Sequence, residues 1–348
     1  MREVSPMTGR AMSLSIAIVS PVIRASAPTR IDLAGGTLDI WPVCFSLDRP
    51  ATTVNLALSL RAQASVEETG DGHVDVRSED RDEAVRLPVG ALRHDRLGLA
   101  TRLAEWYGPG SGLRIVTRST VPPQSGLGGS SALGVALAGA LARLRGRDVD
   151  LREVQDVETA LLGVPTGYQD FVPPLLGGVH ALTAAPGGPR IERIEGAGRF
   201  LAGHLLLADT RIAHESGMNN WEVVKRFLDG DGHVRACMNR INDCARDLRG
   251  ALEARDLDGF AAALDAEWRA RRELAPVVSN ARIEAMAKAA RDAGALAAKV
   301  CGAGGGGCMV LVVREAKEPG VARAIETAGG AIVPFEPDAQ GLRVSSSQ

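Results

Sequence analysis

Hydrophobic patterning divides the chain into a strand-rich first half and a largely helical second half. Apolar residues alternate with small or polar ones over 52–60, which predicts a half-buried strand. Further strands are expected through Ile31 and Leu33, at 74–76 and at 114–120. Leucines at helical intervals predict a helix over 133–144, and a second helix is expected at 150–163, opened by a capping box of Asp150 and Glu153.

The second half follows a turn or linker at 184–189, with the sequence AAPGGP. A strand is expected at 204–209, then helices at 219–228, 234–254, 257–274 and 281–293. A short strand at 296–300, a run of glycines and an apolar strand at 309–313 come next. This order of elements predicts two α+β domains in sequence.

The run VPPQSGLGGSSALGVALAGA (121–140) is a glycine/serine loop that leads directly into the first helix. Its glycines permit backbone conformations that a Cβ resists, and Ser130 and Ser131 are expected to cap the helix or to face an anion or its metal. Free N–H groups at a helix start attract anions, so a polyphosphate is the expected ligand, although a plain structural turn with a capped helix fits the same residues. The lysine of a P-loop and the motifs of protein kinases are absent.

Composition excludes several classes of partner. The apolar fraction is 45%, the charged fraction 24% and the net charge −2, with no dense block of Lys and Arg, so neither a nucleic-acid surface nor a membrane surface is expected. Five scattered cysteines without zinc spacing indicate a reducing compartment, and the six histidines show no metal spacing. The apolar run at 12–23 resembles a signal peptide, but serines and Pro21 interrupt it, and we expect a cytoplasmic protein.

Two carboxylates in the first half could carry chemistry. Glu158 falls in the apolar stripe of its predicted helix, where a charge is costly unless it is paired or coordinated. It is therefore either a salt-bridge or rim residue, or an oxygen ligand for Mg²⁺. Asp170 lies in the turn TGYQD, where it is either a solvated cap or a catalytic carboxylate.

Two glycine-containing segments could approach a ligand. In APTRIDLAGGTLDI (27–40), Asp39 could accept hydrogen bonds from sugar hydroxyls, or Thr37 and Asp39 could simply cap a hairpin turn. In KVCGAGGGGC (299–308) the glycines have GxGxxG spacing but lead into a strand rather than a helix. This second segment fits a loop packed against a ligand or the first domain better than a dinucleotide site.

Together these three segments resemble the signature motifs of the GHMP kinases, the superfamily of galactokinase, homoserine kinase and mevalonate kinase, in the same order along the chain. The resemblance implies an α+β, two-domain fold, with a ribosomal S5 domain 2-like N-terminal domain and a ferredoxin-like C-terminal domain. We expect an N-terminal extension at 1–23, the ATP-binding domain at 24–195 and the C-terminal domain at 196–348.

Within the superfamily, the motifs are most similar to those of kinases for D-glycero-D-manno-heptose 7-phosphate. This similarity implies transfer of the γ-phosphoryl group of ATP, with Mg²⁺, to a hydroxyl of a sugar or sugar phosphate. The chain departs from the heptose pattern at Thr37 and Leu38.

The resemblance also assigns roles to residues. Asp170 would orient or deprotonate the acceptor hydroxyl, with Arg30 next to it, and Mg²⁺ would be held by Glu158 and by Ser130, or by Ser131 in its place. The expected ATP-phosphate residues are Pro123, Gly126, Leu127, Gly128, Gly129, Ser130 and Ser131. The expected acceptor residues are Gly35, Gly36, Thr37, Asp39, Gly167, Gln169, Arg211, Gly304 and Gly305.

Two other functions fit the same motifs. One is a sensor that binds nucleotide and sugar without turnover, although a sensor has no need to keep the transfer groups. The other is a kinase of the mevalonate or homoserine type. In each case the partner is a small molecule, and a homodimer is left open.

Overall fold

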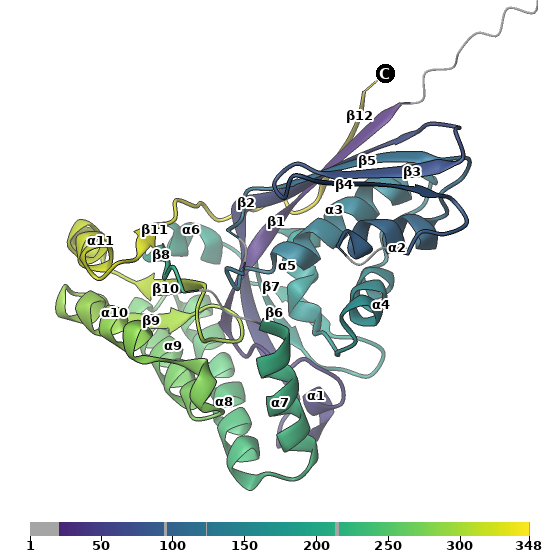
Figure 1. The fold of residues 1–348 in the computed structure, drawn as a ribbon. Helices are drawn as coiled ribbons and strands as arrows, with labels where there is room; N and C mark the ends of the chain where they lie inside the picture. The colour runs from purple at the N-terminus through teal and green to yellow at the C-terminus, as the bar shows by residue number, and fades with distance from the viewer. Residues whose placement is uncertain (1–20, 94–95, 123, 213–215, 348) are drawn as a thin grey trace, which may run out of the picture.

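The structure is a computed structural model that describes residues 21–93, 96–122, 124–212 and 216–347, in which two sheets are covered by helices (Figure 1). The larger sheet has eight strands in the order β12-β1-β2-β5-β3-β4, with β6 paired to β2 and β7 paired to β6. The smaller sheet has four strands in the order β11-β8-β10-β9. Among these pairings β3 and β5 run parallel, and the others are antiparallel.

The larger sheet contains β1 (Val22–Ala34), β2 (Thr52–Glu68), β3 (His73–Ser78), β4 (Glu83–Pro88), β5 (Leu113–Ser119), β6 (Val179–Thr183), β7 (Arg190–Arg193) and β12 (Arg343–Ser347). The smaller sheet contains β8 (Leu205–Asp209), β9 (Ala297–Val300), β10 (Cys308–Val312) and β11 (Ala331–Ile332). The helices are α1 (Val43–Ser46), α2 (Gly98–Tyr107), α3 (Gly129–Leu144), α4 (Leu151–Leu162), α5 (Val172–Leu176), α6 (Ala197–Ala202), α7 (Ser216–Leu228), α8 (Gly232–Ala254), α9 (Leu257–Arg272), α10 (Ala281–Asp292) and α11 (Glu318–Thr327). Single turns of 3₁₀ helix are η1 (Tyr168–Asp170), η2 (Pro276–Val278) and η3 (Glu315–Lys317).

Helix α3 is the central helix of the first domain. It packs against β1 and β2, while α2 and α4 pack on α3 (Figure 1). Leu137 and Leu141 of α3 are fully buried with Val66 and Ile115 of the sheet. The leucine spacing that predicted this helix therefore corresponds to its sheet-facing side.

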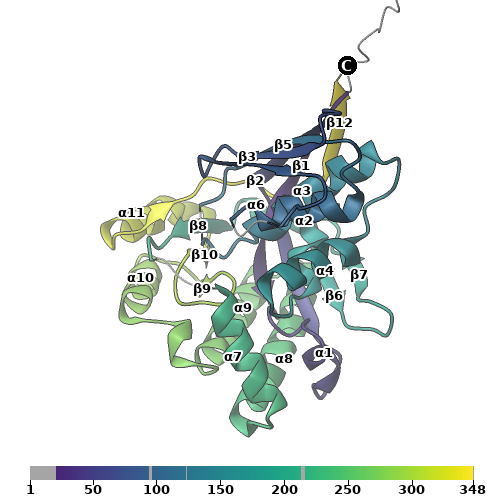
Figure 2. The ribbon, with the colours of Figure 1, turned by 45° about the vertical axis from the view of Figure 1, so that its right-hand side comes forward.

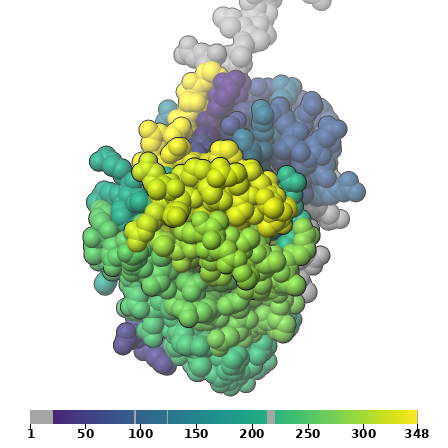
Figure 3. Space-filling view, turned by 90° about the vertical axis from the view of Figure 1, so that its left-hand side faces the viewer, coloured from purple at the N-terminus to yellow at the C-terminus, as the bar shows by residue number. Residues whose placement is uncertain are grey.

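The smaller sheet is buried on both faces. Leu205 and Leu207 of β8 belong to the cluster that includes residues of α8 and α9, whereas Leu206 and Ala208 belong to the cluster with α10 and α11. Because both faces are covered, these strands consist of continuous apolar runs without alternation. Figure 3 shows the face where the C-terminal segment, coloured green to yellow, covers the molecule.

One hydrophobic cluster joins the two halves of the chain. Leu56 of β2 is fully buried in the same cluster as Leu207 of β8, Leu248 of α8 and Val310 of β10. The α8–α9 pair lies between the two sheets (Figures 1 and 2) and contacts strands of both. A continuous hydrophobic core therefore connects the larger sheet to the smaller one.

The chain returns to the larger sheet at its C-terminal end. Strand β12 pairs with β1, with Val22 opposite Ser347, and the two strands lie side by side in Figures 1 and 2. Residues 343–347, which were predicted to belong to the C-terminal domain at 196–348, form a strand of the larger sheet instead. Most of these residues are exposed and their sequence, RVSSS, has no alternating apolar pattern, so nothing in it predicts an edge strand.

Other predicted elements are close to the observed ones, with two differences. The segment 184–189, predicted as a turn or linker, is the turn of the β6–β7 hairpin. Strand β2 continues to Glu68, eight residues beyond the predicted end. Asp150 caps α4 by accepting from the backbone of Arg152, but Glu153 binds Arg147, so the predicted capping box does not form. Within the described ranges, no helix has the length and apolarity needed to cross a bilayer.

Candidate active site

The glycine/serine loop ends where α3 begins, and two of its glycines are left-handed. φ is +74° at Gly126 and +71° at Gly128, the N-cap residue of α3. No side chain caps this helix, so the prediction that Ser130 and Ser131 are caps is wrong, and both lie in its first turn. The first amide groups of α3 remain available to bind an anion.

The second glycine-rich loop packs directly on the first. It connects β9 to β10, and Cys308 N–H donates to the carbonyl oxygen of Ser125 at 2.8 Å. Added Cβ atoms would lie 2.5 Å from the carbonyl oxygen of Cys301 at Gly126, and 2.7 Å from that of Ser125 at Gly307. Only glycine permits this contact, which confirms the expectation that the GxGxxG-like segment packs on the first domain.

Arg30 of β1 connects the glycine/serine loop, the predicted phosphate loop, to Asp170. Its backbone N–H donates to the carbonyl oxygen of Leu127 at 2.9 Å, and its Nη1 donates to that of Gly126 at 2.7 Å. Its Nε donates to Oδ1 of Asp170 at 2.9 Å, and its Nη2 donates to the same oxygen. Burial opposes the charge on Arg30, but Asp170 outweighs it and raises the pKa of Arg30 above its ordinary value.

Asp170 keeps one carboxylate oxygen free. It lies at the end of η1, and its side chain is 26% exposed, so it is more enclosed than a solvated turn residue. Both bonds from Arg30 go to Oδ1, and Oδ2 has no hydrogen bond to any residue that the structure describes. Oδ2 can therefore accept a hydrogen bond, or a proton, from an incoming hydroxyl group.

Glu158 of α4 lies buried against the first turn of α3. It is 2% exposed, and the Ser131 hydroxyl donates to its Oε2 at 2.8 Å. Burial raises the pKa of Glu158, while hydrogen bonds from Ser130 and Ser131 act in the opposite direction. No Lys or Arg of the described chain forms a salt bridge with Glu158, so a carboxylate and two hydroxyls present oxygen atoms only. These are the ligands that Mg²⁺ prefers, and a divalent cation would offset the buried charge.

Asp39 is held beside the segment that carries Asp170. Its Oδ2 accepts from the backbone N–H of Gln169 at 2.8 Å. An added Cβ on Gly167 would lie 2.2 Å from that oxygen, so a glycine is needed there. Oδ1 of Asp39 is buried without a partner, and burial raises the pKa of Asp39 to about 7. An unpaired buried oxygen is costly, which suits a position that a ligand completes.

Hydrogen bonds with Asp32, Arg271 and Asn220 hold the loop before Asp39 in place. Gly36 N–H donates to Oδ1 of Asp32 at 3.2 Å, and the Gly36 carbonyl accepts from Nη2 of Arg271 at 2.9 Å. The hydroxyl of Thr37 donates to Asn220 of α7 at 2.9 Å. This backbone is therefore positioned by charged groups of both domains.

Those charged groups form a buried network that the sequence analysis missed. Lys299 Nζ lies 3.3 Å from a carboxylate oxygen of Asp32 and 3.3 Å from one of Glu267, and Arg271 Nε donates to Glu267 at 3.0 Å. All four side chains are at least 98% buried. Burial is the largest single influence on Asp32 and would raise its pKa, but the positive charges of Lys299, Arg271 and Arg30 together outweigh burial and lower that pKa. Two positive and two negative charges thus neutralise one another.

Across the part of the chain that the structure describes, some of the other residues predicted to bind the acceptor form no hydrogen bond with Arg30, Asp39 or Asp170. Gly35 lies at the start of the fixed loop with φ of +87°. Arg211 is exposed, and its side chain has no hydrogen bond or ion pair within the described residues. Gly304 and Gly305 pack on η2, where Gly305 N–H donates to Val278 at 2.7 Å. Pro123 lies outside the described residues.

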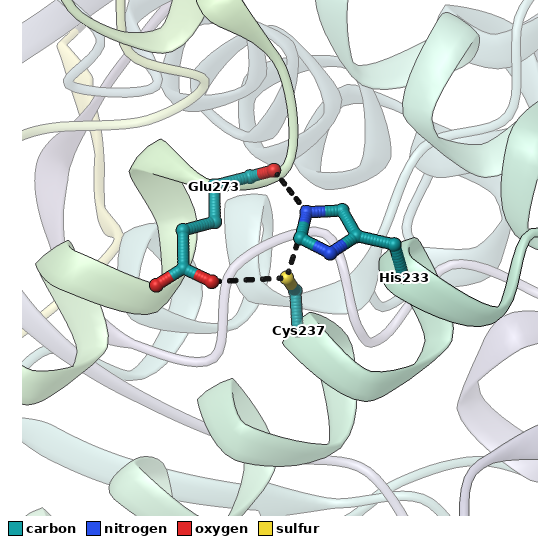
Figure 4. A group of neighbouring side chains, drawn as sticks. All are labelled: His233, Cys237 and Glu273. Atoms are coloured by element: carbon teal, nitrogen blue, oxygen red, sulfur yellow. Dashed lines mark hydrogen bonds between the residues drawn. The ribbon is translucent and has the colours of Figure 1, made fainter.

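A second polar cluster lies at one end of the α8–α9 pair (Figure 4). Ligand-type atoms of His233, Cys237 and Glu273 all lie within 4.8 Å of one another, although the sequence analysis found no metal spacing. His233 and Cys237 have i, i+4 spacing, but His233 lies just before the helix predicted at 234–254, and α8 begins at Gly232. Arg240 Nη2 donates to the Cys237 sulfur at 3.1 Å and also to Glu273. The guanidinium of Arg240 thus already supplies a positive charge to this cluster, and we assign the cluster to helix packing.

The fold and the site define a two-domain α+β protein in which a helix start without a side-chain cap lies beside an arginine–aspartate pair. Residues 95–178 match the family described as GHMP kinases N terminal domain, and residues 248–331 match GHMP kinases C terminal. The chain belongs to the GHMP kinase family, as its motifs predicted.

Individual relatives agree with this assignment. The chain is 26% identical over 341 residues to D-glycero-alpha-D-manno-heptose 7-phosphate kinase of Campylobacter jejuni, with 92% of this chain and 98% of the relative covered. It is 25% identical over 327 residues to the bifunctional fucokinase/GDP-fucose pyrophosphorylase of Arabidopsis thaliana, where 85% of this chain covers only 30% of the relative's length. The solved structure of a D-glycero-D-manno-heptose 1-phosphate kinase from Bacteroides thetaiotaomicron is similar, with a TM-score of 0.75 and 21% identity. The match covers 94% of this chain and 99% of that structure. The predicted two-domain α+β fold is confirmed.

Proposed function

We propose that this protein is an ATP-dependent kinase that transfers the γ-phosphoryl group to a hydroxyl of a sugar or sugar phosphate. The observation that carries the proposal is the Arg30–Asp170 pair, which lies against the phosphate loop and leaves Oδ2 of Asp170 unbonded. The relatives named above are sugar kinases by name, which supports a sugar as acceptor.

On the donor side, the residues provide a cradle for phosphate and metal. The first amides of α3 and the loop from Gly126 to Ser131 would bind the phosphate oxygens of ATP. Glu158 and Ser130 would hold Mg²⁺, with Ser131 orienting the carboxylate through its 2.8 Å hydrogen bond. Bound there, Mg²⁺ would neutralise the charge on the phosphate oxygens.

On the acceptor side, Asp170 would receive the proton of the hydroxyl that attacks the γ-phosphorus. Arg30 holds Oδ1 of Asp170 through two hydrogen bonds, which leaves Oδ2 for the acceptor hydroxyl. Asp39 would hold other hydroxyls of the acceptor through its unpaired Oδ1. Arg211 as a ligand for an acceptor phosphate stays a prediction.

Product identification tests this function directly. The protein is incubated with MgATP and hexoses or heptoses, each with and without a terminal phosphate, and with mevalonate and homoserine. We expect ADP release above the acceptor-free rate with at least one sugar or sugar phosphate, and a phosphorylated product by mass spectrometry. Turnover of mevalonate or homoserine alone would contradict the acceptor class. Nucleotide binding without any product would instead indicate a sensor.

The raised pKa of Asp39 predicts that acceptor affinity depends on pH. A carboxylate accepts a hydroxyl hydrogen bond more strongly when it is ionised, so sugar binding favours the charged form and lowers the pKa of Asp39 from its value of about 7. Between about pH 6 and about pH 8, we expect the acceptor KM to fall by roughly tenfold. The measurement is KM against pH for the wild type and for Asp39→Asn.

The asparagine variant is the matched control, because it cannot titrate. It should show a high KM with little pH dependence over the same interval. A wild-type profile that runs parallel to that of Asp39→Asn would remove Asp39 from acceptor binding.

A further inference from the structure

A cavity of about 600 Å³ begins at Asp39 and extends away from the residues assigned above. Its walls are α1 and the segment before it, the N-terminal half of α4, Tyr168 of η1 and the β6–β7 turn. Neither the phosphate loop nor Asp170 lines it. Its volume is in the range of small-molecule sites and exceeds what one hydroxyl contact to Asp39 requires.

Two exposed aromatic side chains line this cavity. Trp41 is 72% exposed and Phe45 is 51% exposed, and both follow Asp39 closely in the chain. Leu182 and the small apolar residues of the β6–β7 turn form another part of the wall. An aromatic side chain left open beside an acceptor site offers an apolar face on which a flat ligand can stack.

The polar groups of the cavity have unused hydrogen-bonding capacity. Oδ1 of Asp39 is buried and unpaired. The guanidinium of Arg152, the carboxylate of Asp156 and the hydroxyl of Tyr168 have no hydrogen bond or ion pair with any other residue in the described part of the chain. The cavity therefore presents free donors and free acceptors together, which suits hydroxyl groups, since each hydroxyl both donates and accepts.

The charges of the cavity disfavour an anion. Asp156 is acidic, and Asp39, whose pKa is about 7, adds a partial negative charge near neutral pH, against the single positive charge of Arg152. A phosphate or carboxylate substituent would meet more repulsion than attraction there. An uncharged, hydroxyl-bearing ring satisfies both the polar groups and the aromatic walls.

We propose that this cavity binds a second, uncharged sugar ring of the acceptor, so that the substrate class includes glycosides of the phosphorylated sugar. The inference rests on the proposed function, because it takes Asp39 as the contact shared by the two rings. Trp41 stacks on the second ring, and Arg152 and Tyr168 bind its hydroxyls.

Calorimetric titration of the full-length protein, without nucleotide, tests this inference. The probes are D-mannose with mannobiose, D-galactose with galactobiose and D-glucose with cellobiose, together with mannose 6-phosphate. We expect at least one disaccharide to bind about tenfold more tightly than its monosaccharide, and Trp41→Ala to remove that advantage while leaving monosaccharide affinity unchanged. Trp106→Ala is the matched control, since Trp106 is 55% exposed on α2 and does not line the cavity.

The outcomes separate this inference from the proposed function. Monosaccharide binding with no gain for any disaccharide, or a gain that survives in Trp41→Ala, overturns the second-ring site alone. Tight binding of mannose 6-phosphate that is lost in Arg152→Gln shows that the cavity takes an anion and also overturns it. If no sugar binds, the second-ring site is overturned, whereas the proposed function is decided separately by product formation with MgATP.

Discussion

Replacing Asp170 by asparagine should lower kcat by about 10²–10⁴ and leave ATP affinity within about twofold of the wild type. Asparagine keeps the shape of the side chain and an oxygen for Arg30 but cannot take a proton. Because Asp170 bonds to Arg30 through Oδ1 alone, the lost function is that of Oδ2, which has no hydrogen bond to a described residue. The measurements are steady-state kinetics with the acceptor found by product identification and calorimetric binding of a non-hydrolysable ATP analogue.

Stability must be measured alongside, since the variant leaves buried Arg30 without its counter-charge. Arg30 also bonds to two loop carbonyls, so we expect the variant to remain folded. Asp48→Asn is the control, because Asp48 is exposed and distant in the chain from the loop. A folded Asp170→Asn enzyme that turns over near the wild-type rate would show that the acceptor hydroxyl needs no base in this protein.

Replacing Lys299 by methionine should reduce the free energy of unfolding by about 3–5 kcal/mol. The change removes one positive charge from a network of two positive and two negative side chains that are at least 98% buried. Asp32 and Glu267 would then share Arg271 alone, and the carbonyls of Asp32 and Leu33 would lose their donor. Chemical denaturation monitored by circular dichroism gives the value.

Two companion variants make this result specific. Lys288→Met removes a lysine that is 75% exposed in an i, i+4 pair with Asp292, and should change stability by less than about 0.5 kcal/mol. In the double variant Lys299→Met/Glu267→Gln, charge balance returns, so the loss should be smaller than the sum of the single losses. A Lys299→Met loss below about 1 kcal/mol would mean that the network is not held as the structure shows.

Local signals allowed much of the donor side to be predicted. The leucine spacing of α3 and the glycines before it placed an anion site at a helix terminus without any tertiary information. Glu158 stood out because a carboxylate on an apolar stripe demands an explanation, and the structure buries it against Ser131. The turn around Asp170 gave no comparable sign of function, because an aspartate in a turn is usually a solvated cap. Asp170 was predicted to be catalytic from the resemblance to a family.

Other parts of the site had no local signal. In the sequence, Glu267 and Arg271 form an ordinary i, i+4 pair on a long predicted helix. Lys299 lies in the predicted strand at 296–300, three residues before the first glycine of the run. Their burial depends on three elements far apart in sequence, β1, α9 and β9, meeting at one point. Likewise the serines of α3 were expected to cap the helix, but the N-cap residue is Gly128, and Ser131 donates to Glu158 instead.

Patterns along the chain were enough to predict many of the regular elements and a loop suited to phosphate, because both depend on residues that are neighbours in the chain. The folded structure showed which oxygen of Asp170 stays free, which charges are buried beneath the loop before Asp39 and that a cavity opens beside Asp39. These depend on distances between segments that only the packing of two sheets brings together, since burial and pairing of charges are properties of the assembled core.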